Sequence, residues 1–229
     1  MHLAPLGDHA VLVTLGDSIG EATHRRVQAA VARIDHARIR GVVDLVPAFA
    51  SVAVHYDPRA VEGDGGSPYA RLRDRLRREL SDLTNEELPP ARVVEIPVCY
   101  GDELGPDLDE VATMHEMSAA DVIRLHSDAL YLVYMVGFMP GFAYLGGLPE
   151  LIATPRRSSP RSAVPAGTVG IGGSQTGVYP LVSPGGWNLI GRTPRKMFDI
   201  GRDEATLLAT GDRVRFRPIT RAEFDDWRE

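Results

Sequence analysis

The sequence predicts an α+β protein, with a small N-terminal α+β domain over residues 1–88 and a β-rich domain over residues 89–229. In residues 1–88, segments with the apolar pattern of a strand alternate with segments that have the apolar pattern of a helix. In the second part, the block from Gly137 to Arg192 contains 12 of the 23 glycines and seven of the 17 prolines. Because glycine and proline are the least favourable residues in a helix interior, this block is expected to form short strands and tight turns, as in a compact barrel or sandwich.

The N-terminal domain is predicted to contain a strand, a helix, two strands and a second helix. Asp17 or Ser18 is placed to cap the first helix, and Gly41 is placed to end it. A Pro-Pro pair and charged residues at 84–90 break both periodicities, which predicts the domain boundary. The strands are expected at 10–15, 42–46 and 51–56, and the helices at about 19–38 and 68–83.

The second domain is predicted to begin with a strand and two helices. Ser118 is placed to cap the second of these helices, with Asp121 three residues further on. Outside the glycine-rich block, the strands are expected at 92–100, 130–137, 197–200 and 213–218, and the helices at 108–115 and 119–127.

Composition argues against several classes of protein. The net charge of −6 argues against a nucleic-acid partner, which requires clustered positive charge. Cys99 is the single cysteine, so an internal disulfide is excluded, and the seven histidines are too scattered to predict a metal site. The N-terminus lacks a signal-peptide pattern and no segment approaches ~18 consecutive apolar residues, so a cytoplasmic location is expected.

The run Gly172–Gly177 (GGSQTG) has the glycine spacing of a phosphate-binding loop, but Val178 and Tyr179 stand where that loop needs Lys and Ser/Thr. Ser174 does not lie in a nucleophile elbow, and no histidine follows it in the chain. The segment is most simply a cluster of β-turns. A nest of backbone amides for an anion, formed around Gly172, Gly173, Gln175 and Thr176, remains the functional alternative.

Arg156, Arg157 and Arg161 lie within seven residues of one another, among three serines. Guanidinium groups bind carboxylates and phosphates through paired hydrogen bonds, so these arginines are candidates for holding an anionic substrate group. A solvated loop is the competing interpretation. Tyr179 and Arg192 are also predicted to bind the substrate.

His126 ends a predicted helix about ten residues before the glycine-rich block. It is the candidate catalytic residue, as a general base or a substrate contact. The structural alternative is a protonated imidazole that stabilises the C-terminus of the helix.

Four aromatic residues are expected to line a pocket or a partner-facing wall. Trp187 and Tyr179 are interpreted as core or pocket-wall residues, with direct stacking on a ligand as the alternative. Among the four, Trp187 and Phe142 are the candidates for the edge of a surface that docks a second protein. The four are Phe138, Phe142, Tyr144 and Trp187.

Taken together, four long stretches in order resemble the family of the B component of bacterial 5-oxoprolinase. This family is also described as allophanate hydrolase subunit 1, and it includes Kip-type inhibitors of sporulation kinases. The stretches are GFMPGFAYLGGLP, TPRRSSPR, VPAGTVGIGGSQTGVYP and SPGGWNLIGRTP.

This resemblance implies a C-terminal cyclophilin-like β-barrel of the carboxyltransferase type. It also implies that the protein acts with a second barrel protein, the C component, and with a third, the A component. Together these would convert 5-oxo-L-proline, ATP and water into L-glutamate, ADP and phosphate. ATP would be a co-substrate of the complex, without a metal ligand in this chain, and the chain alone is expected to be inactive.

Two alternatives to this function stay open within the same resemblance. One is a carboxyltransferase-type protein that works on a urea-like substrate with biotin. The other is a histidine-kinase inhibitor without turnover of its own.

Overall fold

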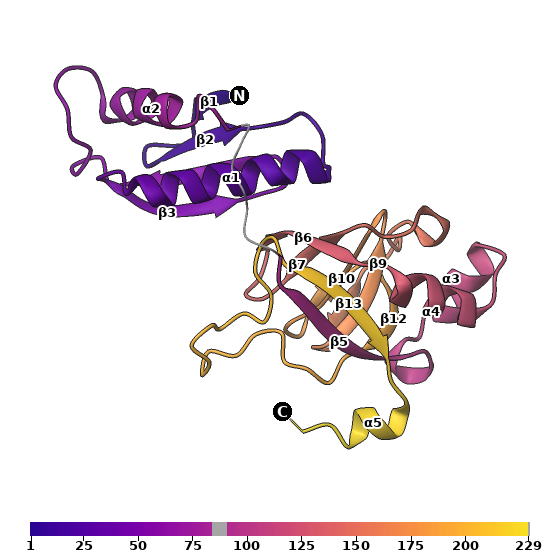
Figure 1. Ribbon diagram of the computed structural model, residues 1–229. Coiled ribbons are helices and arrows are strands. Elements are labelled where there is room, and N and C mark those ends of the chain that lie inside the picture. Colours follow the sequence, from indigo (N-terminus) through magenta and orange to yellow (C-terminus); the bar gives the residue numbers. More distant parts are fainter. Residues whose placement is uncertain (84–90, 229) are drawn as a thin grey trace. The chain divides into compact units, whose positions relative to one another are not determined.

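The computed structural model describes residues 1–83 and 91–228, and the chain divides into two compact units, Met1–Pro90 and Ala91–Glu229 (Figure 1). The boundary expected between residues 88 and 89 lies outside the described residues. Within the described part of the chain, no helix has the length and hydropathy needed to cross a membrane.

The N-terminal unit is an antiparallel sheet with two helices. The strands follow the order β1-β2-β4-β3. Alternate residues of a strand point to the same face, and alternate residues of β2 and β4 are buried in one cluster with side chains of α1 and α2. The elements are β1 (His2–Pro5), β2 (Ala10–Thr14), α1 (Glu21–Ala37), β3 (Val42–Pro47), β4 (Ser51–Tyr56) and α2 (Pro68–Glu79).

Local details of this unit differ from the prediction. The strand β1 was not predicted, because its four residues show no alternating pattern. The helix α1 begins after Gly20, whose position carries no side-chain cap, so the prediction of Asp17 or Ser18 as the cap is wrong. It ends at Ala37, and the next residue, Arg38, takes the left-handed conformation, so the prediction that Gly41 ends the helix is wrong.

The second unit is a closed barrel with the strand order β10-β7-β6-β13-β5-β12-β9. Figure 1 shows its first and last strands, β5 and β13, side by side, and they pair in parallel. A separate ribbon is formed by β8 and β11. The strands are β5 (Val93–Tyr100), β6 (Tyr131–Val136), β7 (Ala143–Gly146), β8 (Arg161–Val164), β9 (Thr168–Gly172), β10 (Gln175–Val178), β11 (Ser183–Gly185), β12 (Asn188–Arg192) and β13 (Arg213–Pro218).

Short helices connect and flank the strands of this unit. Ser118 caps α4 as predicted, since its hydroxyl accepts a hydrogen bond from the Asp121 amide at 3.1 Å. The helices are η1 (Asp102–Leu104), α3 (Leu108–Met114), α4 (Ala119–Asp128), η2 (Glu150–Ile152) and α5 (Arg221–Asp225).

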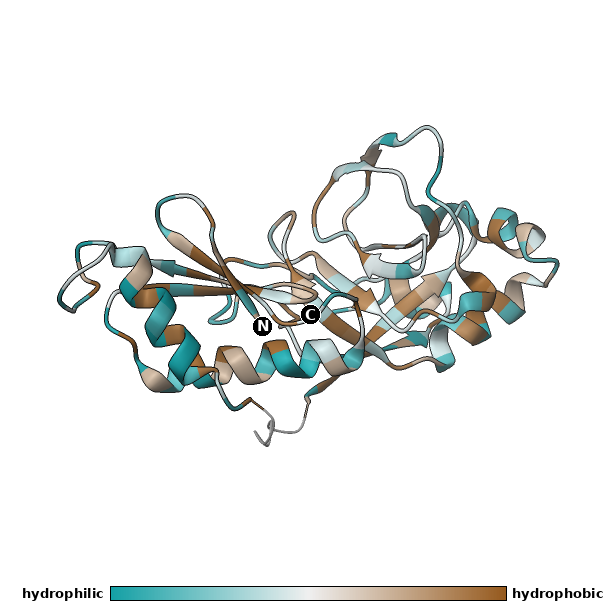
Figure 2. Ribbon diagram, turned by 90° about the horizontal axis from the view of Figure 1, so that it is seen from above, coloured by the Kyte–Doolittle hydropathy of each residue, from teal (hydrophilic) through white to brown (hydrophobic). Residues whose placement is uncertain are grey.

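The barrel core is filled by apolar side chains from all the strands of the barrel, and hydrophobic residues (brown in Figure 2) are concentrated on these strands. The predicted α+β class is confirmed, and the glycine-rich block does form short strands, β7 to β12. The strand predicted at 197–200 is wrong, because this segment forms a single bridge between Phe198 and Thr206.

Candidate functional site

The arginine-rich segment begins beside the glycine hairpin. The strands β9 and β10 are joined through Gly173 and Ser174, and Gly173 has a φ of +66°. Thr154 forms an antiparallel bridge with Gly173, whose amide donates to the Thr154 carbonyl at 2.7 Å. This bridge brings Arg156, two residues further on, to the hairpin.

The GGSQTG run is a β-hairpin and does not form the predicted amide nest. The amide of Gly173 is used by Thr154, and Gln175, Thr176 and Gly177 take part in the ladder with β9. A nest requires successive amides that point at one anion, and pairing with a neighbouring strand prevents this. Gly172 serves close packing instead, since a Cβ there would lie 2.4 Å from the Trp187 indole.

Arg157 and Arg161 form ion pairs with a carboxylate of the protein itself, that of Asp107. The Asp107 Oδ1 accepts from Arg161 at 2.6 Å and from Arg157 at 3.2 Å. The second oxygen, Oδ2, accepts from the Leu189 amide at 2.6 Å, and only 3% of Asp107 is exposed. Arg157 also binds Glu110 at 2.9 Å, and this bond, with the charge of Asp107, raises the pKa of Arg157. Neither the anion site nor the solvated loop predicted this internal partner, and contact of Arg157 or Arg161 with a substrate stays a prediction.

Asp107 was missed by the sequence analysis. Its position directly before α3 is typical of a helix cap, yet its side chain makes no capping hydrogen bond. The carboxylate reaches β12 at Leu189 instead, and it fixes the arginine segment to the barrel. Only the tertiary structure brings these groups together.

Arg156 differs from its two neighbours. Its side chain is exposed and forms no ion pair within the described residues. The guanidinium carbon lies 5.9 Å from the ring centre of Trp187, in the range of a cation–π contact. Among the three predicted arginines, Arg156 is the one that is exposed and forms no ion pair within the described residues, so its guanidinium group can reach a ligand from solvent.

Arg192 and Tyr179, the remaining residues predicted to bind substrate, make contacts within the protein. Arg192 donates through Nε to the Ala166 carbonyl at 2.9 Å. Tyr179 is 3% exposed, and burial raises the pKa of its hydroxyl, which accepts from the Trp187 amide. Both residues support the turns around the hairpin, and direct contact of either with a substrate stays a prediction.

His126 lies in a buried hydrogen-bonded chain. Its Nε2 is 2.9 Å from the Thr176 hydroxyl, and its Nδ1 is 2.8 Å from the Tyr100 hydroxyl. The Thr176 hydroxyl is also 2.9 Å from the Gly170 carbonyl, to which it must donate. Since that bond uses the single hydroxyl hydrogen, His126 must donate from Nε2 and accept from Tyr100 at Nδ1.

The environment of His126 keeps the imidazole neutral. Burial lowers the pKa of His126 to about 3, and its ring stacks on Phe216 with 4.6 Å between the ring centres. The alternative of a protonated imidazole at the end of α4 is therefore wrong, because desolvation exceeds the attraction of the helix terminus. The ring has no exposed surface, and a general-base role stays a prediction.

The four aromatic candidates differ in exposure, and Tyr144 is half-buried beside the cluster that contains Phe142 and Trp187. Phe142 and Trp187 are 3% and 5% exposed, so the prediction that they edge a docking surface is wrong. Phe142 contacts Tyr144 and Trp187 in T-shaped pairs, with ring centres 4.9 and 5.7 Å apart. Phe138, by contrast, is 74% exposed in the β6–β7 connection.

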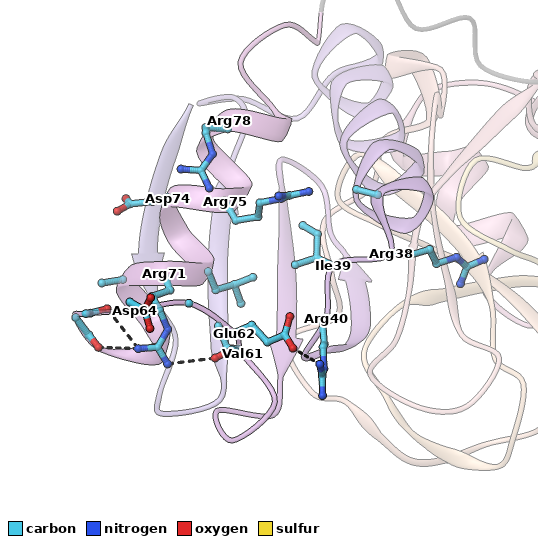
Figure 3. A pocket seen from close by; sticks show the side chains of 16 residues that line it. Arg38, Ile39, Arg40, Val61, Glu62, Asp64, Arg71, Asp74, Arg75 and Arg78 are labelled. Atoms are coloured by element: carbon cyan, nitrogen blue, oxygen red, sulfur yellow. Dashed lines mark hydrogen bonds and ion pairs between the residues drawn. The ribbon is translucent and has the colours of Figure 1, made fainter.

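A separate pocket of about 590 Å³ lies in the N-terminal unit (Figure 3). Arg71 donates to the Val61 carbonyl at 3.1 Å, and Arg40 pairs with Glu62. These contacts hold the loop at 61–66. The five arginines that line the pocket are Arg38, Arg40, Arg71, Arg75 and Arg78. In neither of the ranges 1–83 and 91–228 do three or more His, Cys, Asp or Glu side chains gather as a metal site would require.

Comparison with known proteins places the chain in one family. Residues 1–208 match the family described as carboxyltransferase domain, subdomain C and D. The B component of 5-oxoprolinase from Bacillus subtilis (strain 168) is 42% identical over 232 residues, which cover 98% of this chain and 95% of that protein.

Two solved structures share the fold. TTHA0988 has a TM-score of 0.78 and 39% identity, over 92% of this chain and 40% of that longer chain. The Kluyveromyces lactis urea amidolyase has a TM-score of 0.75 over 97% of this chain and 15% of its own, and its 20% identity shows a likeness of fold alone. The resemblance drawn from the four sequence stretches is confirmed, and the chain belongs to the family of the B component of 5-oxoprolinase.

Proposed function

We propose that this chain is the B component of an ATP-dependent 5-oxoprolinase, and that it acts with the C and A components to open 5-oxo-L-proline to L-glutamate. The observation that carries the proposal is the 42% identity to the Bacillus subtilis protein along almost the full length of both chains. The wider likeness to urea amidolyase concerns the fold, so it gives no separate support to a urea-like substrate.

The chemistry of the reaction suits a shared site. A lactam is an unactivated amide. Transfer of a phosphoryl group from ATP to its oxygen makes the carbonyl carbon susceptible to attack by water. Such a reaction requires positioned cations and hydrogen-bond donors more than a protein nucleophile. Arg156 is the available cation beside the hairpin, whereas the hairpin amides are used in the ladder. We therefore propose that the companion proteins supply most of the groups that bind ATP.

The purified chain is expected to be catalytically silent, because the described residues of its candidate site offer one exposed arginine without an ion pair and no complete catalytic set. ADP release that depends on 5-oxoproline is expected when the B and C components are combined, and glutamate release when the A component is added. The measurement is a coupled ADP assay together with chromatographic detection of glutamate. Substantial turnover by the chain alone would contradict the proposal, as would a complete complex that leaves 5-oxoproline unchanged.

Replacing Arg156 with alanine is expected to lower the catalytic efficiency of the complete complex by about ten- to a hundredfold. Charge-assisted hydrogen bonds contribute roughly 1.5–3 kcal/mol, and 1.4 kcal/mol corresponds to a factor of ten. Lysine should restore part of the loss, since it keeps the charge without the planar fork. Steady-state kinetics of the complex give the result.

The matched control is Arg124→Ala, which removes an exposed arginine from α4 in the same unit. Both variants should keep the melting temperature of the parent, because neither guanidinium group holds the fold together. If Arg156→Ala and Arg124→Ala have the same catalytic efficiency as the parent complex, Arg156 belongs to a solvated surface and has no substrate role.

A further inference from the structure

Phe138 has an unusual backbone conformation for its residue type. Its φ is +73°, in the left-handed region, where a Cβ crowds the following carbonyl. In the described residues three other non-glycine residues have positive φ, and all three carry polar or charged side chains, as is common in turns. These are Arg38, Asp102 and Glu116.

The ring of Phe138 gains little from the fold in return. It is 74% exposed, and it meets the edge of Phe142 with 5.8 Å between ring centres and an angle of 80°. Asn or Gly would relieve the backbone at this position at little loss of buried area. An aromatic side chain at this position is therefore unfavourable in two ways. It strains the local backbone, and it leaves apolar surface exposed to water.

The turn that carries Phe138 is held firmly. The Gly137 amide donates to the Phe142 carbonyl at 2.9 Å, and the Phe142 amide donates to the Met139 carbonyl at 3.1 Å. Gly141, with φ of +80°, lies so close to the 197–198 segment that a Cβ would come within 2.8 Å of the Phe198 Cβ. Phe138 thus projects from a fixed base, and little conformational entropy is lost when its ring is buried by another molecule.

We propose that Phe138 is the anchor by which this chain binds its companion barrel protein, the C component, with the ring inserted into an apolar pocket of that partner. A strained backbone kept at an exposed aromatic residue indicates a binding role, and aromatic residues are enriched at the centres of protein interfaces. A protein occupant is favoured because the relatives are named as one subunit of an enzyme, and because the TTHA0988 chain extends well beyond the part that this chain matches. The inference rests on the proposed function.

The test compares Phe138→Asn with the parent chain in two measurements. Asparagine accepts the left-handed conformation, so the melting temperature of the chain alone should be unchanged or up to about 4 °C higher. Affinity for the purified C component, measured by calorimetry, should be at least tenfold weaker. Phe138→Gly is a second variant with the same expected loss of affinity. Leu151→Asn, which replaces another exposed apolar side chain of the unit, should leave the affinity within twofold.

Each outcome of these measurements supports or contradicts the role of Phe138 as an anchor. If parent and Phe138→Asn bind the C component equally, the anchor is wrong while the proposed function stands. If the parent chain does not bind the C component at all, the proposed function itself fails. If both Phe138 variants melt below the Leu151→Asn control or do not fold, the ring stabilises this chain internally, which overturns the proposal.

Discussion

Replacing Asp107 with alanine is expected to lower the free energy of unfolding of the barrel unit by about 2–4 kcal/mol. The carboxylate is 3% exposed and accepts hydrogen bonds from Arg157, Arg161 and the Leu189 amide. Removal of one partner from a buried ion pair costs about 3–5 kcal/mol. The expected value is lower, because 31% and 29% of the two arginine side chains are exposed, and water can partly replace the carboxylate.

Tryptophan fluorescence during urea unfolding is a suitable measurement, since both tryptophans, Trp187 and Trp227, lie in the barrel unit. Asp107→Asn should fall between alanine and the parent, because the amide oxygen still accepts from Leu189 without supplying a charge. Glu110→Ala removes the exposed partner of Arg157 and should cost at most about 1 kcal/mol. An Asp107→Ala protein as stable as Glu110→Ala would show that the buried carboxylate does not hold the arginine segment in place.

The stability of the barrel unit is expected to decline as the pH falls below about 6.5, and His126 is the expected cause. Burial lowers its pKa from 6.5 to about 3 in the folded chain. Between these two values the unfolded state binds a proton that the folded state does not. The free energy of unfolding therefore decreases toward acid, by up to about 1.4 kcal/mol per pH unit from this group, and the contribution is fully present above pH 6.5.

The pH dependence is measured best between pH 7 and 5, above the range where most carboxylates titrate. His126→Gln should flatten the slope of unfolding free energy against pH, even if it lowers the stability at pH 7 through altered packing. His36→Gln removes an imidazole from the N-terminal unit, so it serves as the control and should leave the slope for the barrel unit unchanged. Equal slopes for His126→Gln and the parent would mean that another group causes the acid sensitivity.

The arginines were recognised in the sequence while their partner Asp107 was not, and the reason is physical. Three arginines within a few residues are a local feature. Asp107, the partner of Arg157 and Arg161, is 50 and 54 residues away from them, and nothing near it in the chain distinguishes it from an ordinary residue at a helix start. Likewise, His126 lies 50 residues from Thr176, so its hydrogen bonds and its neutral state could not be read from its place at the end of a helix.

The aromatic residues show the same limit. Phe138 and Phe142 stand four residues apart in GFMPGFAYL, and pattern alone gives no reason to separate them. Phe142 is buried against Trp187 in a second cluster, separate from the barrel core, while the turn between β6 and β7 holds Phe138 outside. Which of two similar side chains is exposed depends on the path of the backbone, and that path is settled by strand pairing across the whole unit.

The α+β class, most of the strands and the family could all be predicted from the amino-acid sequence. These depend on residue spacing and on glycine and proline, whose backbone preferences act within a few residues. Tertiary contacts make the GGSQTG run a paired hairpin, pair Asp107 with two of the three candidate arginines, and leave Arg156 and Phe138 exposed at the surface. These outcomes depend on hydrogen bonds and burial between distant segments, which exist only after the barrel has closed.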